Sequence, residues 1–199
     1  MGKLRTAVIG AGKMGAIHAK VYSRMENCAL AAVVDCDPAR AKALADVYGC
    51  RAETDPNAIL DSVDAVTISA PTSAHGSLAK LFLEHRIPVL IEKPLASNVA
   101  EGQEIVRLAR QYNTVAAVGH SERCNPVVLA MKRLDIEPRF IESNRVSPYP
   151  FRSSDIGVVL DVMIHDIDII LSLARSPIRQ VEAVGVNVIG DHEDICNAR

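Results

Sequence analysis

A glycine-rich turn directly follows the first strongly apolar run of the sequence. Residues 10–15 read GAGKMG, which fits the pattern G-x-G-x-x-G between a strand and a helix. In that setting the first glycine permits a tight turn, the second lets backbone approach a diphosphate, and the third allows close helix packing. The N–H groups at the start of the helix then favour phosphate. The pattern predicts a dinucleotide site, against the alternative of a glycine turn without ligand, with contacts from Gly10, Gly12, Lys13, Met14 and Gly15.

A carboxylate, Asp35, ends the second apolar run about 20 residues after the last glycine of the turn. This spacing is typical of a carboxylate that binds the 2′-hydroxyl of an adenosine ribose. A 2′-phosphate would be repelled there, and the neighbours Cys36 and Asp37 offer no arginine to accept it. The predicted cofactor is therefore NAD, and NADP is disfavoured. Alternatively, Asp35 or Asp37 caps the helix that begins at Pro38, and both roles can coexist.

Further polar residues follow the later apolar runs, at the sheet edge where ligands of open α/β folds bind. Lys93 comes directly after the run 89–91, so its ammonium could bond a substrate hydroxyl or the cofactor. A lysine that extends along the surface into solvent is the alternative. The segment Gly119-His120 ends the next run in the same way. The residues predicted to line the cofactor side of this edge are Ala70, Pro71, Thr72, Glu92 and Lys93.

A carboxylate and an imidazole, Asp161 and His165, stand four residues apart in an apolar helical segment. On one helix face the carboxylate could orient the ring, which could then take a proton from an alcohol. Asp168 could orient the same ring, and an ordinary hydrogen-bonded histidine is the alternative. His165, Asp166 and Asp168 lack a recognised ligand spacing, so no metal is expected. Four further histidines are interpreted as ordinary hydrogen-bonded residues: His18, His75, His85 and His192.

The elements that must position these residues alternate as strand and helix up to residue 120, a pattern that requires parallel strands and crossover helices. Strands are predicted at 5–9, 29–35, 65–69, 89–92 and 115–119, with a weaker one near Arg51. Helices are predicted at 14–24, 38–48, 73–85 and 99–111. The fold class is α/β, with a doubly wound parallel Rossmann sheet over 1–120 as the dinucleotide-binding domain.

The regular alternation of strand and helix ends after residue 120. A helix at 126–134, an extended segment at 139–146, a helix at 158–174 and a strand at 181–189 are expected. Two strands and one helix do not easily close a core. Residues 121–199 are therefore interpreted as the start of an α+β substrate and oligomerisation domain that is truncated.

Composition excludes several classes of function. Of 199 residues, 49% are hydrophobic and 23% charged, which excludes a disordered chain. A net charge of −2, no long basic run and no tryptophan argue against a nucleic-acid partner. No apolar stretch reaches the ~20 residues of a membrane span, and the start lacks the regions of a secretory signal, so a cytoplasmic protein is expected. Five scattered cysteines predict reduced thiols.

The sequence resembles the Gfo/Idh/MocA oxidoreductase family over nearly its whole length. The matching segments are VIGAGKMG, the strand-end Asp35, SAPTSAH, IEKP, GHSERCNP and DVMIHDID. Members of that family oxidise or reduce sugars and cyclitols with NAD(P). The lysine of their E-K-P segment and an Asp-x-x-x-His pair form the catalytic set, so the resemblance implies these roles for Lys93, Asp161 and His165. It also implies a C-terminal domain whose large open sheet completes the substrate pocket and commonly mediates homo-oligomerisation.

Two segments, GHSERCNP and RVSPYPFRSSDIGVVLDVMIHDID, are further similar to members that act as UDP-N-acetylglucosamine 3-dehydrogenases. Two departures stand out: Cys124 replaces a common aromatic residue, and family members usually continue well past residue 199. The expected function is NAD-dependent oxidation of a secondary hydroxyl of a sugar or nucleotide sugar. A non-catalytic NAD-binding regulator or an inactive truncated member is the alternative. Candidate substrate contacts are His120, Arg123, Arg145 and Arg152, although the arginines could equally be surface charges.

Overall fold

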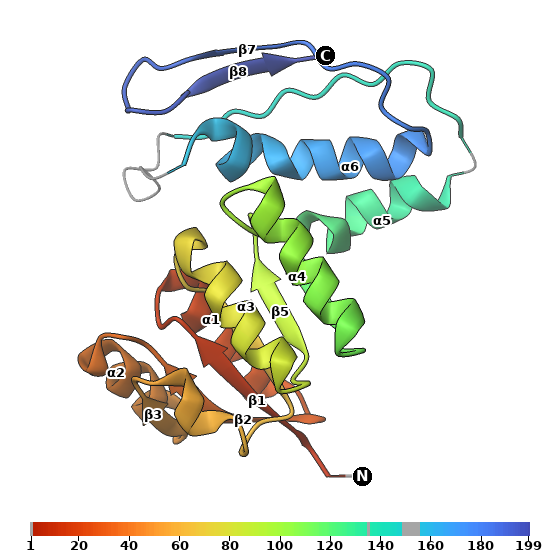
Figure 1. Cartoon of the computed structure of the whole chain (residues 1–199). Helices are drawn as coiled ribbons and strands as arrows, with labels where there is room; N and C mark the ends of the chain where they lie inside the picture. The colour runs from red at the N-terminus through yellow and green to blue at the C-terminus, as the bar shows by residue number, and fades with distance from the viewer. Residues whose placement is uncertain (1, 135, 149–155) are drawn as a thin grey trace. The chain divides into compact units, whose positions relative to one another are not determined.

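The chain forms two compact units, residues 1–119 and 120–199, each of which is described by itself (Figure 1). The computed structural model describes residues 2–134, 136–148 and 156–199. The boundary between the units follows the last strand of the first sheet. Within the described residues, no helix is both long enough and apolar enough to cross a membrane.

A six-stranded parallel sheet forms the centre of the first unit, in the order β3-β2-β1-β4-β5-β6. This order reverses direction between β1 and β4, which is the switch point where dinucleotides bind in doubly wound folds. The doubly wound α/β fold predicted from the sequence is confirmed. The strands are β1 (Leu4–Ile9), β2 (Cys28–Val34), β3 (Arg51–Glu53), β4 (Ala65–Ile68), β5 (Val89–Glu92) and β6 (Ala116–Gly119).

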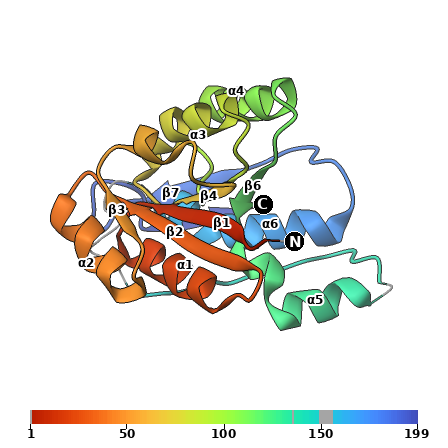
Figure 2. The same cartoon turned by 90° about the horizontal axis from the view of Figure 1, so that it is seen from below.

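Helices cover both faces of this sheet. Figure 2 shows α1 (Lys13–Arg24) and α2 (Pro38–Tyr48) on one face, with α3 (His75–Glu84) and α4 (Val99–Gln111) on the other. A short 3₁₀ turn, η2 (Thr72–Ala74), leads into α3, and another, η1 (Pro56–Ile59), follows β3. Because both faces are covered, the strands need apolar side chains in both directions, which explains their near-continuous apolar sequences.

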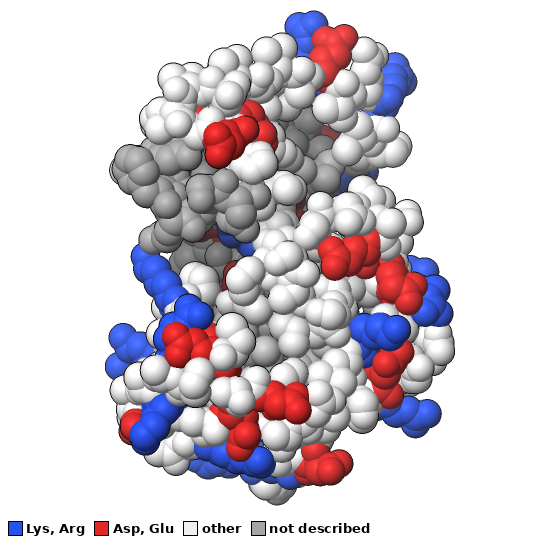
Figure 3. Space-filling view, turned by 60° about the vertical axis from the view of Figure 1, so that its left-hand side comes forward, with Lys and Arg blue, Asp and Glu red and all other residues white. Residues whose placement is uncertain are grey.

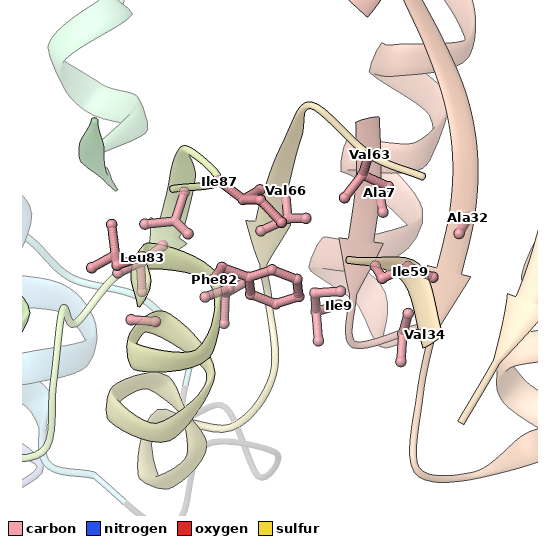
Figure 4. Packing of buried hydrophobic residues seen from close by; sticks show 14 of the residues in the cluster. Ala7, Ile9, Ala32, Val34, Ile59, Val63, Val66, Phe82, Leu83 and Ile87 are labelled. Carbon is pink, nitrogen blue, oxygen red and sulfur yellow. The ribbon is translucent and has the colours of Figure 1, made fainter. Parts of the chain in front are cut away.

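The core between α3 and the sheet fixes the strand ends. Phe82 and Leu83 of α3 are fully buried and pack with Ile9, Val66 and other strand residues (Figure 4). Packing at this density leaves little room for the strands to shift, since interiors are packed as tightly as organic crystals. The residues that follow β1, β4 and β5 are therefore presented from a rigid edge.

The second unit contains helices and one antiparallel pair of strands. Its elements are η3 (Ser121–Cys124), α5 (Pro126–Arg133), a π-helical turn η4 (Val159–Met163), α6 (Ile164–Ala174), β7 (Ala183–Val186) and β8 (Ile195–Ala198). The extended segment expected at 139–146 is not part of any strand; β7 pairs with β8 instead. No residue of α6 is fully buried, so this unit has little core of its own among the described residues.

Candidate functional site

At two of its three glycines, the turn between β1 and α1 leaves no room for a side chain. Gly10 has a φ of +99°, and a Cβ there would lie 2.7 Å from the carbonyl oxygen of Ser69. A Cβ on Gly15 would overlap the carbonyl oxygen of Gly10. At Gly12, by contrast, a Cβ would meet no atom within 4 Å. The first and last glycines thus hold the turn together, while the middle one leaves open space in front of it.

The first turn of α1 faces this open space without a side-chain cap. The N-cap residue is Gly12, and no acidic residue stands in the first turn. Two of the other long helices differ, because Asp37 caps α2 and Asn98 caps α4, whereas α3 also lacks a side-chain cap but continues directly from η2. Uncapped N–H groups and the helix dipole favour an anion at this position. Together with the bare backbone of Gly12, they fit the diphosphate of a dinucleotide.

The carboxylate of Asp35, only 8% exposed, lies at the end of β2 beside the turn. One oxygen accepts a hydrogen bond from the Ala11 N–H at 2.7 Å, and the other accepts one from the Asp37 N–H at 2.9 Å. Burial alone would raise the pKa of Asp35, but these hydrogen bonds and the Arg40 guanidinium outweigh burial and lower it. Asp37, not Asp35, caps α2, so the two aspartates have separate tasks.

An arginine that the sequence did not indicate lies near the predicted ribose site. Arg40 of α2 places its guanidinium 3.3 Å from Asp35 and 3.2 Å from Asp37. Cys36 and Asp37, the two residues after Asp35, are not basic, but the first turn of α2 brings Arg40 back to the strand end. The thiol of Cys36, which is exposed, lies 3.7 Å from the same Asp35 carboxylate.

The turns after β4 and β5 are joined to their surroundings by polar contacts. Ala70 and Pro71 follow β4, and Thr72 begins η2. The Ser69 hydroxyl lies 3.0 Å from the Gly10 carbonyl oxygen, which ties this loop to the glycine turn. After β5, the Lys93-Pro94 peptide bond is cis.

Two histidines contact the residues on either side of Lys93. Nε2 of His18, on α1, lies 2.7 Å from the Glu92 carboxylate. Nδ1 of His75, at the start of α3, lies 2.9 Å from the Pro94 carbonyl oxygen, and Nε2 lies 3.0 Å from that of Ala70. The ordinary interpretation of His75 as a hydrogen-bonded histidine fits these contacts. The contacts with Glu92 and Pro94 could not be found from the sequence, because the partners are far apart in the chain.

The second unit contains the predicted Asp-x-x-x-His pair. Asp161 stands in the π-helical turn η4, and its N–H donates to the Gly157 carbonyl oxygen at 3.1 Å. His165 stands in the first turn of α6. The helix predicted over 158–174 is therefore present, but it begins with a wider turn, of a kind found frequently at functional sites. Lys93 belongs to the other unit.

Two of the predicted substrate arginines form ion pairs with α6. Arg123 of η3 donates two hydrogen bonds to Asp168, at 2.7 and 2.5 Å, and Arg145 donates two to Asp166, at 2.8 and 3.0 Å. These hydrogen bonds are the main reason why the pKa values of Asp168 and Asp166 lie below their usual range. Arg152 lies outside the described residues.

The remaining candidate, His120, begins the second unit. Its Nδ1 is buried and makes no hydrogen bond with the described residues. Among those same residues, no group of three or more His, Cys, Asp or Glu side chains is arranged to hold a metal ion.

Comparison with known proteins places this chain in a family. Residues 4–120 match the family model GFO_IDH_MocA, described as an oxidoreductase family with an NAD-binding Rossmann fold. The chain is 36% identical over 196 residues to a UDP-N-acetylglucosamine 3-dehydrogenase of Acidithiobacillus ferrooxidans, covering 98% of this chain and 62% of that protein. It is 34% identical to inositol 2-dehydrogenase 2 of Mycolicibacterium vanbaalenii, covering 92% of this chain and 57% of that protein.

Solved structures agree with the sequence comparison. A structure of the Acidithiobacillus ferrooxidans UDP-N-acetylglucosamine 3-dehydrogenase matches with a TM-score of 0.93 and 36% identity, covering 100% of this chain and 65% of the other. The chain thus spans less than two thirds of the length of these relatives.

Proposed function

Because this chain belongs to the Gfo/Idh/MocA family of NAD-binding oxidoreductases, we propose that it is an NAD-dependent dehydrogenase of a sugar or nucleotide sugar. The 3-hydroxyl of UDP-N-acetylglucosamine is the first candidate for its substrate, given the named relative. The observation that carries the proposal is the pair formed by the open glycine turn and the Asp35 carboxylate bonded to it. This pair suits a diphosphate and a ribose hydroxyl held side by side.

The catalytic roles follow from the chemistry of the side chains. Bound NAD would accept the hydride that leaves the substrate carbon. His165 removes the hydroxyl proton as a general base, and Asp161 stabilises the imidazolium that forms. Lys93 holds the reacting oxygen through a charged hydrogen bond. In this proposal residues 1–120 bind the cofactor, whereas residues 121–199 contribute to the substrate site.

The face drawn in Figure 3 bears acidic and basic side chains that are interspersed rather than gathered by sign. Such a face suits a cytoplasmic enzyme of small molecules better than a phosphate-backbone binder. We further propose a homo-oligomer assembled through the second unit. Its described residues leave large apolar side chains exposed on β7, among them Val184 at 69% and Val186 at 50%.

Activity of the full chain tests the proposal. NADH formation is measured with UDP-N-acetylglucosamine, and NADH binding is measured from the fluorescence of the nucleotide itself. Lys93→Ala and His165→Ala are each expected to lower kcat by at least about 100-fold, while Lys20→Ala, an exposed lysine of α1, serves as the control. Tight NADH binding without turnover of any sugar substrate would favour a regulatory protein. Unchanged kcat in both variants would overturn the assigned roles.

A further inference from the structure

Lys93 stands between two residues that are each held by a histidine from a different helix. On one side, Nε2 of His18 lies 2.7 Å from the Glu92 carboxylate; their side chains are 18% and 13% exposed. On the other side, Nδ1 of His75, whose exposure is 1%, lies 2.9 Å from the Pro94 carbonyl oxygen. The lysine is thus bracketed by contacts in a partly buried setting, where hydrogen bonds constrain geometry strongly.

Each histidine also connects this segment to the cofactor side of the sheet edge. His18 lies on α1, the helix whose first turn faces the predicted diphosphate position. His75 places its second nitrogen 3.0 Å from the Ala70 carbonyl oxygen, in the loop that follows β4. The two ring nitrogens of His75 thus lie within 3.0 Å of carbonyl oxygens in two neighbouring strand-end loops.

The neighbouring strand, β6, also limits the space around the Glu92 side chain. A Cβ on Gly119, which pairs with Glu92 across β5 and β6, would lie 2.9 Å from the Glu92 carboxylate oxygen. The carboxylate thus fills the room left by the glycine and meets His18 there. This arrangement holds the carboxylate against the sheet edge in one defined position.

We propose that His18 and His75 are positioning residues for Lys93, which they hold in place through Glu92 and Pro94 and tie to the cofactor-binding loops. The inference rests on the catalytic role proposed for Lys93. In proximity-based catalysis, a displacement of about 1 Å can cost about 100-fold in rate. Loss of either histidine is therefore expected to lower kcat much more than it weakens NADH binding.

A matched pair of variants on α1 tests the role of His18. His18→Leu removes the contact with Glu92, whereas Tyr22→Phe, one turn later, removes a comparable hydrogen bond from α1 to Thr67 of β4. In the full chain, His18→Leu is expected to lower kcat at least tenfold with the Kd for NADH changed less than threefold. Tyr22→Phe is expected to leave kcat within twofold. His18→Gln, which keeps a donor at a similar reach, is expected to restore most of the rate.

Backbone hydrogen exchange gives a readout that does not depend on turnover. In His18→Leu, the peptide covering residues 89–97 is expected to exchange at least fivefold faster, and in Tyr22→Phe it is expected to match the wild type. His75→Leu should give the same acceleration, with His85→Leu as control, because His85 is an exposed histidine just after the same helix.

The outcomes separate this inference from the proposed function. Hydrogen exchange over residues 89–97 that is faster in His18→Leu and returns to the wild-type rate in His18→Gln supports the positioning role. This holds even if the wild-type chain turns over no sugar, a result that would overturn only the proposed function. Equal exchange and equal kcat in His18→Leu and Tyr22→Phe would overturn the positioning role. If His75→Leu does not fold, the His18 series still decides.

Discussion

Some residues of the glycine turn are required for folding, and others are placed to bind the cofactor. Gly10 and Gly15 are required by the backbone itself, whereas Gly12 has open space before it. Asp35 combines both tasks, because it accepts hydrogen bonds from the turn and presents a carboxylate at the predicted ribose position. Substitutions at these positions should therefore separate cofactor affinity from stability.

Gly12→Ala is expected to weaken NADH binding at least tenfold, or about 1.4 kcal/mol, because the methyl group enters the diphosphate space. Its φ of −75° is accessible to alanine, so the thermal midpoint should stay near that of the wild type. Gly15→Ala should instead lower the free energy of unfolding by about 1–3 kcal/mol through overlap with Gly10. Titration of NADH and thermal unfolding measure the two effects, with Gly102→Ala as control. Loss of stability in Gly12→Ala would contradict this division.

The lowered pKa of Asp35 predicts how stability depends on pH. A carboxyl group whose pKa is lower in the folded state stabilises the fold above its unfolded pKa of about 3.9 and loses that contribution as pH falls through the folded value. Asp35→Asn is expected to cost about 1–3 kcal/mol between pH 5 and 8. The difference between variant and wild type should shrink below about pH 4. Urea unfolding across this range measures it, and a difference that grows on acidification would be inconsistent with the assignment.

Helix α6 of the second unit receives two ion pairs, whereas the helices of the first unit pack on an apolar core. The carboxylates of Asp166 and Asp168 are 14% and 11% exposed, and each receives a two-bond contact from an arginine. Because α6 buries no residue fully, these contacts are a main constraint on the helix that bears His165. The sequence could not reveal them, since Arg123 and Asp168 are 45 residues apart.

Arg123→Lys and Arg145→Lys test whether these arginines hold α6 or bind substrate. A lysine keeps the charge but loses the two-bond geometry. If they hold α6, hydrogen exchange over residues 164–174 should accelerate severalfold in the chain without ligands, and kcat should fall with little change in KM. If they bind a diphosphate, KM for a nucleotide sugar should rise and exchange should stay as it was. Arg139→Lys, at an exposed position, is the control.

The chain as a whole shows which features a sequence can and cannot predict. The six-stranded sheet was predictable because its strands are buried on both faces and read as continuous apolar runs. β8 was missed, because its sequence ICNA has no apolar alternation, and the expected strand at 139–146 was wrong, since β7 pairs with β8 instead. The glycine turn and Asp35 were found from local spacing. The contacts of Arg40, His18 and His75 could not be predicted, because only the folded chain brings these residues to Asp35, Glu92 and Pro94.

Cofactor binding should stabilise the whole chain by mass action. NADH at 100 times its Kd is expected to add about 2.7 kcal/mol to the free energy of unfolding. NADPH at the same concentration should add less, because the Asp35 carboxylate repels a 2′-phosphate. Thermal unfolding with each nucleotide measures the difference between the stabilisation by NADH and that by NADPH. Asp35→Asn should make this difference smaller. Equal stabilisation by both nucleotides in the wild type would show that Arg40 offsets the repulsion.

The exposed thiol of Cys36 lies next to Asp35, so its reactivity should report whether the predicted ribose position is occupied. A nucleotide seated there would shield this sulfur from iodoacetamide, whereas Cys124, exposed in the other unit, would continue to alkylate and so provide an internal reference within every molecule. Mass spectrometry of the two peptides could then titrate coenzyme on unlabelled, unmutated protein, even in a crude extract.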